Sequence, residues 1–191
     1  MNRNLNVFRL TMAALLVAIG ILIPMFMPFP FKIYIPPMSF TLASHVAIFI
    51  AMFLSPVIAL AVAVGTTIGF VFSGFPLDVW LRALSHVVWA LIGAIWLKKH
   101  PDILYKPVPS ILFCVVVAVV HAVLELGVVF GLFFGGFAGM VEKFESSGFL
   151  TIFLLVGLGT FLHSSADYII SLLVWRPIRN LKGVRAIAAV H

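Results

Sequence analysis

The sequence is poor in charge. Only 9% of its 191 residues are Asp, Glu, Lys or Arg, whereas 63% are hydrophobic. Soluble domains carry about 25% charged residues and about 45–50% apolar ones. Because so little charge is available to cover a surface in water, the composition excludes an ordinary soluble domain. We expect a single integral membrane domain over residues 1–191.

Cysteine and recognisable catalytic motifs are also scarce. Cys114 is the one cysteine, so a disulfide within the chain and a thiolate metal cluster are excluded. The sequence lacks a GxxxxGK[ST] phosphate loop, and it contains no HExxH or GxSxG motif. These absences argue against nucleotide hydrolysis and hydrolase chemistry. We expect a protein that is not an enzyme and that has no cofactor and no resident metal.

Long apolar runs dominate what is present. A helix needs about 20 apolar residues to cross a hydrocarbon layer of about 30 Å. The runs predict an all-α bundle of six transmembrane helices. Prolines in residues 28–37 favour an extended outer loop, and residues 137–147 resemble a short interfacial helix. The predicted spans are 10–27, 40–54, 57–72, 77–97, 109–134 and 149–175.

The basic residues predict the orientation. Cytoplasmic loops of membrane proteins are enriched in Lys and Arg, and an N-in, C-in arrangement places nine basic residues inside and two outside. Their clustering between apolar runs also argues against nucleic-acid binding. The inner set is Arg3, Arg9, Lys98, Lys99, Lys106, Arg176, Arg179, Lys182 and Arg185, and the outer set is Lys32 and Lys143.

Arg82 is the clearest candidate for a functional residue. A charge inside a bilayer costs about 2.5–3.5 kcal/mol on insertion scales, so it needs a reason to be there. Asp78 and His86 lie four residues to either side and share its helix face. Two interpretations stay open: Arg82 binds the carboxylate of an anionic substrate, or it pairs with Asp78 and only stabilises the outer end of the helix.

Further polar residues interrupt the other spans. His121 and Glu125 share a face at four-residue spacing, so they either bind a ligand or satisfy each other and a neighbouring helix. His45 lies beside the proline-rich segment, which is either a lid or a plain connection. For His163 and Asp167 we expect hydrogen bonds between helices.

Aromatic and small residues give weaker signals. Trp80 and Trp89 are expected in the membrane belt or in lipid packing; stacking on a flat ligand is the alternative. In the first span Ala14 and Ala18 form a small-residue face, which permits close contact with another helix of this chain or of a partner.

Taken together, several features resemble one family. They are the six-span N-in plan, the Ala14 and Ala18 face, the proline-rich segment, and the stretches PMSFTLASHVAIFIAMFLSP (37–56) and VGTTIGFVFSGFP (64–76). Over essentially the whole chain they resemble the substrate-binding (S) components of energy-coupling-factor vitamin transporters, most like the pantothenate or niacin branch.

The resemblance implies a vitamin pocket near the outer face of a prokaryotic cell membrane. It also implies assembly with a transmembrane coupling protein, docked at Ala14 and Ala18, and with two cytoplasmic ATPases. A metal substrate is disfavoured, because the N-terminus lacks the histidine motif of nickel and cobalt members. Pantothenate is the main prediction and niacin the alternative; a membrane enzyme or a scaffold are further alternatives. The implied binding residues are Arg82, Glu125, His121, His86, His45 and Trp80.

Overall fold

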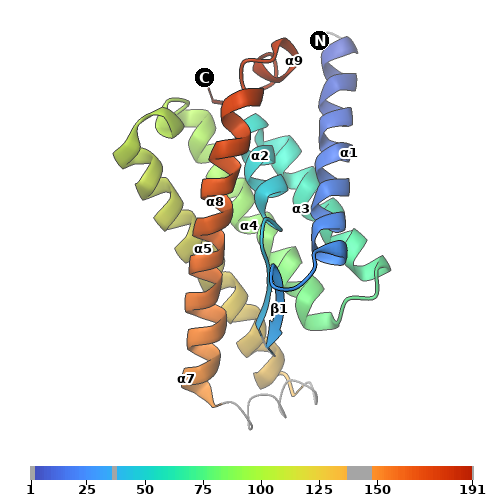
Figure 1. The fold of residues 1–191 in the computed structure, drawn as a ribbon, viewed down its shortest axis with the longest axis vertical. Coiled ribbons are helices and arrows are strands. Elements are labelled where there is room, and N and C mark those ends of the chain that lie inside the picture. Colours follow the sequence, from blue (N-terminus) through green and yellow to red (C-terminus); the bar gives the residue numbers. More distant parts are fainter. Residues whose placement is uncertain (1–2, 36–37, 137–147, 191) are drawn as a thin grey trace.

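The chain folds into a bundle of long helices with one β-hairpin (Figure 1). The fold is taken from a computed structural model, which describes residues 3–35, 38–136 and 148–190. In chain order the elements are α1 (Arg3–Phe26), β1 (Lys32–Ile35), β2 (Met38–Thr41), α2 (Val46–Leu54), α3 (Pro56–Phe72), α4 (Leu77–Lys99), the 3₁₀ turn η1 (Ile103–Tyr105), α5 (Pro107–Phe134), α7 (Phe149–Ile152), the π-helical stretch η2 (Phe153–Leu158), α8 (Gly159–Ile178) and α9 (Lys182–Arg185).

Four helical segments are long and apolar enough to cross a membrane. They are α1, α4, α5 and the continuous run Phe149–Ile178, with 24, 23, 28 and 30 residues. They confirm the predicted helical membrane protein. Helix α3 has 17 residues, at the lower limit for a full span, and α2 with nine residues is too short for one. The count of six spans and the orientation therefore stay predictions.

Helix α2 is short because it lies inside the bundle. All nine of its residues are buried, and a helix that is apolar on every side belongs in a core. The predicted span 40–54 began too early, because residues 40 and 41 belong to strand β2. The apolar side chains of α2 therefore pack against other helices of the protein and do not face lipid.

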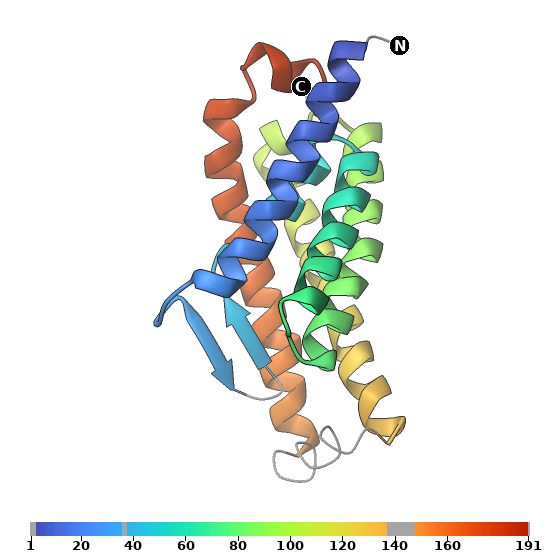
Figure 2. The ribbon, with the colours of Figure 1, turned by 90° about the vertical axis from the view of Figure 1, so that its right-hand side faces the viewer.

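The proline-rich segment contains a hairpin where an extended loop was expected. Strands β1 and β2 pair antiparallel, with Lys32 opposite Thr41 and Ile33 opposite Phe40. The prolines do exclude a helix, but the residues between and after them form two strands that pair with each other. The all-α prediction thus needs this correction. The hairpin follows directly from α1, and β2 packs against α8 (Figure 2).

Both termini lie at the same end of the bundle, and the hairpin lies toward the other (Figure 1). The basic ends of α4 and α8 share the terminal end, in line with the uneven distribution of Lys and Arg in the sequence. The interfacial helix predicted at 137–147, and Lys143 within it, lie outside the described residues.

Small residues bring α1 and α3 close together. Gly65 and Gly69 are one turn apart on α3, and both face α1. A Cβ on Gly65 would lie 2.7 Å from Cγ2 and 3.0 Å from Cγ1 of Val17. Valine is stiff about χ1 in a helix, so it has little freedom to move away. Gly127 on α5 has nothing within 4 Å of such a Cβ.

Gly65 and Gly127 give a matched test of the packing between α1 and α3. Gly65→Ala gains about 0.8–1.0 kcal/mol of helix propensity but overpacks the interface, at a cost of about 1–3 kcal/mol. We expect it to lower the thermal stability of the detergent-solubilised protein. Gly127→Ala makes no clash and should leave the melting temperature unchanged or raise it. Equal stability of the two variants would contradict the close α1–α3 contact.

Candidate functional site

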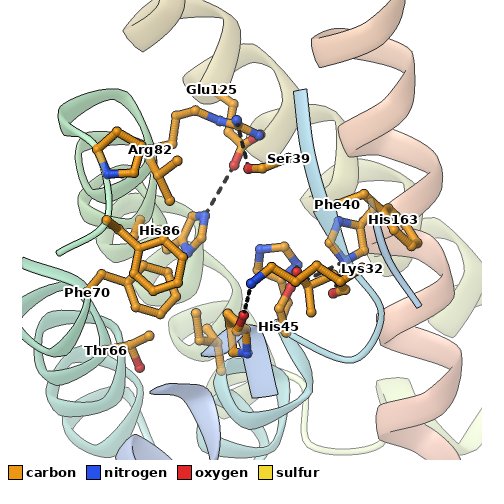
Figure 3. Close-up of a pocket in the computed structure, with 18 of the residues that line it drawn as sticks. Lys32, Ser39, Phe40, His45, Thr66, Phe70, Arg82, His86, Glu125 and His163 are labelled. Atoms are coloured by element: carbon orange, nitrogen blue, oxygen red, sulfur yellow. Dashed lines mark hydrogen bonds and ion pairs between the residues drawn. The ribbon is translucent and has the colours of Figure 1, made fainter. Parts of the chain in front are cut away.

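A cavity of about 300 Å³ opens between the hairpin and the helices behind it (Figure 3). Arg82, His86 and Val79 face it from α4, and Glu125 faces it from α5. The hairpin forms much of the remaining wall. The other lining residues are Pro24, Lys32, Ile33, Ser39, Phe40, Thr41, Ser44, His45, Ile48, Thr66, Phe70, Phe75, Pro76, Ala83 and His163.

A buried ion pair joins α4 to α5 at the wall of this cavity. Nη2 of Arg82 donates to Oε2 of Glu125 at 2.7 Å, and the two residues are only 5% and 4% exposed. Thr160 on α8 donates to the same carboxylate oxygen at 2.6 Å. Nη1 of Arg82 donates to the hydroxyl of Ser39 on β2 at 3.2 Å. The ion pair of Arg82 and Glu125 thus links three helices and the hairpin.

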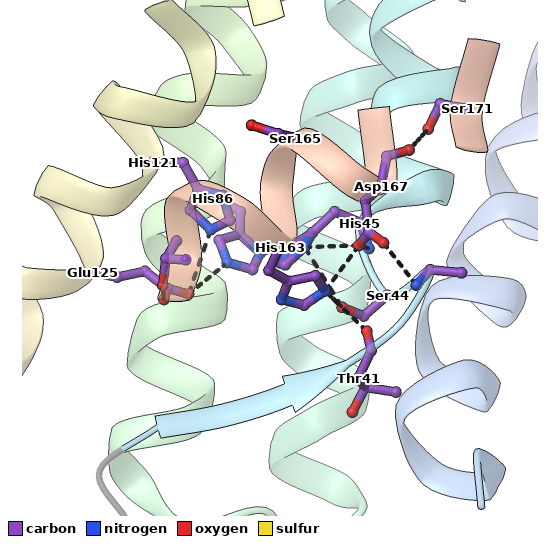
Figure 4. Close-up of polar contacts among 12 residues, drawn as sticks. Thr41, Ser44, His45, His86, His121, Glu125, His163, Ser165, Asp167 and Ser171 are labelled. Carbon is purple, nitrogen blue, oxygen red and sulfur yellow. Dashed lines mark hydrogen bonds and ion pairs between the residues drawn. The ribbon is translucent and has the colours of Figure 1, made fainter. Parts of the chain in front are cut away.

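Two imidazoles approach the other oxygen of Glu125. Nε2 of His86 and Nε2 of His121 each lie 3.4 Å from Oε1 (Figure 4). His121 is completely buried, and its ring stacks on Trp89 with centroids 4.8 Å apart. Oε2 is therefore bound by Arg82 and Thr160, while Oε1 faces the imidazoles.

A second buried carboxylate holds the chain between β2 and α2. Asp167 on α8 accepts backbone N–H groups from Ala43 at 2.7 Å and from His45 at 2.9 Å. It also accepts from Nδ1 of His45 at 3.1 Å, and Nε2 of His163 lies 3.0 Å away (Figure 4). Ala43 has a φ of 67°, a left-handed conformation that costs a non-glycine residue about 1–2 kcal/mol. The bonds to Asp167 offset that cost and fix the turn.

The structure brings most of the predicted site residues together. Arg82, Glu125, His86 and His45 come from separate parts of the chain and line one cavity. Of the two interpretations of Arg82, the pocket-facing one matches its position. The alternative pair with Asp78 does not form, since no ion pair between the two is found in the part of the chain that the structure describes. The reason is that Glu125 reaches the guanidinium from the facing helix.

Other predicted residues lie elsewhere. His121 is packed behind the lining, and Trp89 covers it from the bundle interior. Trp80 is half-buried and is not part of the lining. It lies two residues from Arg82, and two helical residues are rotated by about 200°, so Trp80 points away. The aromatic lining consists of Phe40, Phe70 and Phe75.

Sequence reasoning missed Lys32 and the phenylalanines. Lys32 counted only as an outer charge, yet it lines the cavity, and its ammonium donates to the carbonyl of Pro24 at 2.6 Å. The ammonium also lies 5.7 Å from the ring centre of Phe75. With 19 phenylalanines in the chain, no local signal distinguishes those that face a ligand.

The arrangement places a buried guanidinium and three phenyl rings around one cavity. A fixed guanidinium binds a carboxylate strongly where the surroundings are dry, and phenyl rings favour a planar ligand. Pockets of this kind, mostly apolar with a few placed polar groups, bind small molecules. Fold and site together define a multi-pass membrane protein with a cavity of small-molecule size at its hairpin-covered end.

Comparison with known proteins identifies the family. The chain is 41% identical over 170 residues to the niacin transporter NiaX of Lactococcus lactis subsp. cremoris (strain MG1363), and the match covers 89% of this chain and 74% of the relative. No model of a protein family matches the chain, and no solved structure matches it. The chain belongs to the substrate-binding (S) components of energy-coupling-factor vitamin transporters. It is a non-catalytic transport subunit of the cell membrane.

Asp167 offers a test of how the cavity wall is held. Asp167→Ala leaves buried N–H groups of Ala43 and His45 without an acceptor, at about 1–3 kcal/mol for each. We expect a clear drop in melting temperature. Ser165→Ala is the control, because that hydroxyl bonds to Phe161 in its own helix. A melting temperature for Asp167→Ala equal to that of the control would refute the anchoring role.

Proposed function

We propose that this S component captures niacin as its carboxylate, nicotinate, from the outer side of the membrane. The observation that carries the proposal is Arg82, a buried cation that lines a cavity with a phenylalanine wall. Nicotinate combines one carboxylate with one flat ring. The niacin transporter NiaX is similar over most of the chain. This likeness favours the niacin alternative over pantothenate, the main prediction from the sequence, for which the comparisons offer no support.

The carboxylate would bind Nη1 of Arg82. That nitrogen now donates to Ser39 over 3.2 Å, a longer hydrogen bond than the 2.7 Å ion pair of Nη2 with Glu125. A charged acceptor makes a shorter and stronger bond than a hydroxyl. The ligand would therefore replace Ser39, while Glu125 keeps the guanidinium in place. The ring would lie among Phe40, Phe70 and Phe75.

The hairpin is the element that would move on binding. It supplies Lys32, Ile33, Ser39, Phe40 and Thr41 to the lining, so it covers the cavity. Its contacts with the helices include the long hydrogen bond from Arg82 to Ser39 and the bond from Lys32 to the end of α1. These two contacts would break and re-form as a ligand enters, while the contact of His163 with the carbonyl of Thr41 at 3.0 Å would hold the end of β2 on α8. This proposal takes up the lid interpretation of the proline-rich segment.

Binding measurements with three ligands test the proposed substrate. We expect the purified protein to bind nicotinate more tightly than nicotinamide, which lacks the charge, and more tightly than pantothenate, by isothermal titration calorimetry. Arg82→Lys keeps a charge but loses the planar fork, and the loss of a charged hydrogen bond worth about 1.5–3 kcal/mol predicts about 10–100-fold weaker nicotinate binding.

The double variant Arg82→Met with Glu125→Gln guards against a folding defect. It removes both charges together and so avoids leaving Glu125 as an unpaired buried charge. It should still fold, as a cooperative thermal transition would show, and lose nicotinate binding. Tight binding of pantothenate without binding of nicotinate would reject niacin, and wild-type affinity in Arg82→Lys would reject the role of Arg82.

We propose that Ala14 and Ala18 dock the transmembrane coupling protein, which in turn joins the two cytoplasmic ATPases. Both alanines are exposed on α1, whereas Ala13, Leu16 and Gly20 on the same helix are buried in this chain. The face they form is thus open to a partner. Small residues at this spacing allow two helices to approach closely.

Bulky replacements on this face test the docking. Ala14→Leu with Ala18→Leu should abolish co-purification with the coupling protein and vitamin uptake by cells, while nicotinate binding to the isolated subunit stays unchanged. The matched control replaces Val119 and Val123, exposed at the same spacing on α5, with Leu. Assembly that survives in the alanine variant would place the docking surface elsewhere.

A further inference from the structure

Two histidines of the cavity lining, His45 and His86, form a nearly equilateral triangle with His121 behind them. The ring centroids of His45 and His86 are 4.8 Å apart, those of His45 and His121 are 4.7 Å apart, and those of His86 and His121 are 4.8 Å apart. Each pair of rings is close to perpendicular, with interplanar angles of 76°, 80° and 86°. The three residues come from the start of α2, from α4 and from α5 (Figure 4).

We propose that His45, His86, His121 and Glu125 bind one divalent transition-metal ion, with zinc as the best match. Each offers a ligand atom, and these atoms all lie within 4.8 Å of one another. The proposal is independent of the identity of the vitamin. It reverses the expectation from the sequence that the chain has no resident metal.

The distances suit a tetrahedral ion. Zinc–nitrogen bonds of about 2.0–2.1 Å place neighbouring ligand atoms about 3.4 Å apart and imidazole centroids about 5 Å apart. Oε1 of Glu125 lies 3.4 Å from Nε2 of both His86 and His121. The centroid separations of the triangle are also close to the tetrahedral value. Imidazole and carboxylate ligands are those that zinc prefers in such sites.

His121 supplies independent support. It is 0% exposed, and neither of its ring nitrogens makes a hydrogen bond within the described part of the chain. Its contact with Glu125 is at 3.4 Å but lacks hydrogen-bond geometry. A buried polar group without a partner costs free energy, so such groups need an explanation. Coordination of a cation by one nitrogen would provide it.

Existing hydrogen bonds already orient two of the proposed metal ligands, His45 and Glu125. Because Nδ1 of His45 donates to Asp167, its Nε2 keeps a lone pair that can bind a metal. This carboxylate–histidine arrangement is how proteins orient metal-bound imidazoles. Glu125 is similarly oriented by Arg82 and Thr160 through Oε2, which leaves Oε1 for the ion.

Position and charge also favour a cation here. His45, His86 and Glu125 reach the cavity lining, so an ion can enter through the cavity. The carboxylates of Glu125 and Asp167 lie directly against the imidazoles of the cluster, and a divalent ion would offset their negative charge. An ion held there would tie α2, α4 and α5 together below the cavity.

Metal titration of the full-length protein tests the site. The protein is purified in detergent without a polyhistidine tag, stripped with EDTA, dialysed, and equilibrated with equimolar ZnCl₂ or CoCl₂. We expect one equivalent of bound zinc by mass spectrometry of the metal, and the intense visible absorption of tetrahedral Co²⁺. Zinc should also raise the melting temperature of the stripped protein, because it binds the folded state.

His121→Phe is the decisive variant, since it keeps an aromatic ring against Trp89 and removes one ligand. It should fold and bind zinc more than about 100-fold more weakly. If His121→Phe fails to fold, His86→Gln takes its place and should show the same loss of zinc affinity. His100→Gln, at the exposed end of α4, controls for surface binding and should match the wild type.

Three outcomes would overturn the site. They are no zinc bound by the stripped wild type, wild-type binding by His121→Phe or by its substitute, and loss of zinc in His163→Gln with retention in His121→Phe. The last would assign the ion to His45, His163 and Asp167, the second group with suitable spacing. Nicotinate titration of the stripped wild type tests the proposed vitamin separately.

Discussion

The ion pair of Arg82 and Glu125 is the interaction on which the ligand-binding half of the molecule depends. Either charge alone inside a bilayer costs about 2.5–3.5 kcal/mol on insertion scales, so neither helix can place its charge there without the other. Their pairing at 2.7 Å brings α4 against α5, Thr160 adds α8, and Ser39 adds the hairpin. The contacts among α4, α5, α8 and the hairpin at the cavity thus meet at this one ion pair.

Asp167 has the same role on the other side of the cavity. It accepts the backbone N–H groups of the turn between β2 and α2 and so fixes the inner end of the hairpin to α8. The inner end of the hairpin is therefore anchored to α8 by buried bonds, and Lys32 and Ser39 join its strands to Pro24 and Arg82. Under the proposed function, these outer contacts would break when a ligand enters, while the bonds to Asp167 would keep the hairpin attached to the bundle.

The same two carboxylates connect the proposed vitamin site with the proposed metal site. Glu125 orients Arg82 with one oxygen and faces His86 and His121 with the other. A divalent ion on the second oxygen would add positive charge directly beneath a bound carboxylate. Under the proposed function, partner ATPases would supply the energy, and this chain would only bind, cover and release the vitamin.

The sequence by itself determined the membrane environment, most helix positions, and Arg82, His86, His45 and Glu125 as residues that need a reason to be buried. Hydropathy and charge are local properties, so they are readable without a fold. Only the tertiary structure decided that Arg82 pairs with Glu125 instead of Asp78, that Lys32 and not Trp80 lines the cavity, and that three distant histidines meet. Sequence spacing reveals neighbours on one helix. In a membrane interior, however, a polar group is satisfied by whichever facing element reaches it, and that depends on how the helices pack.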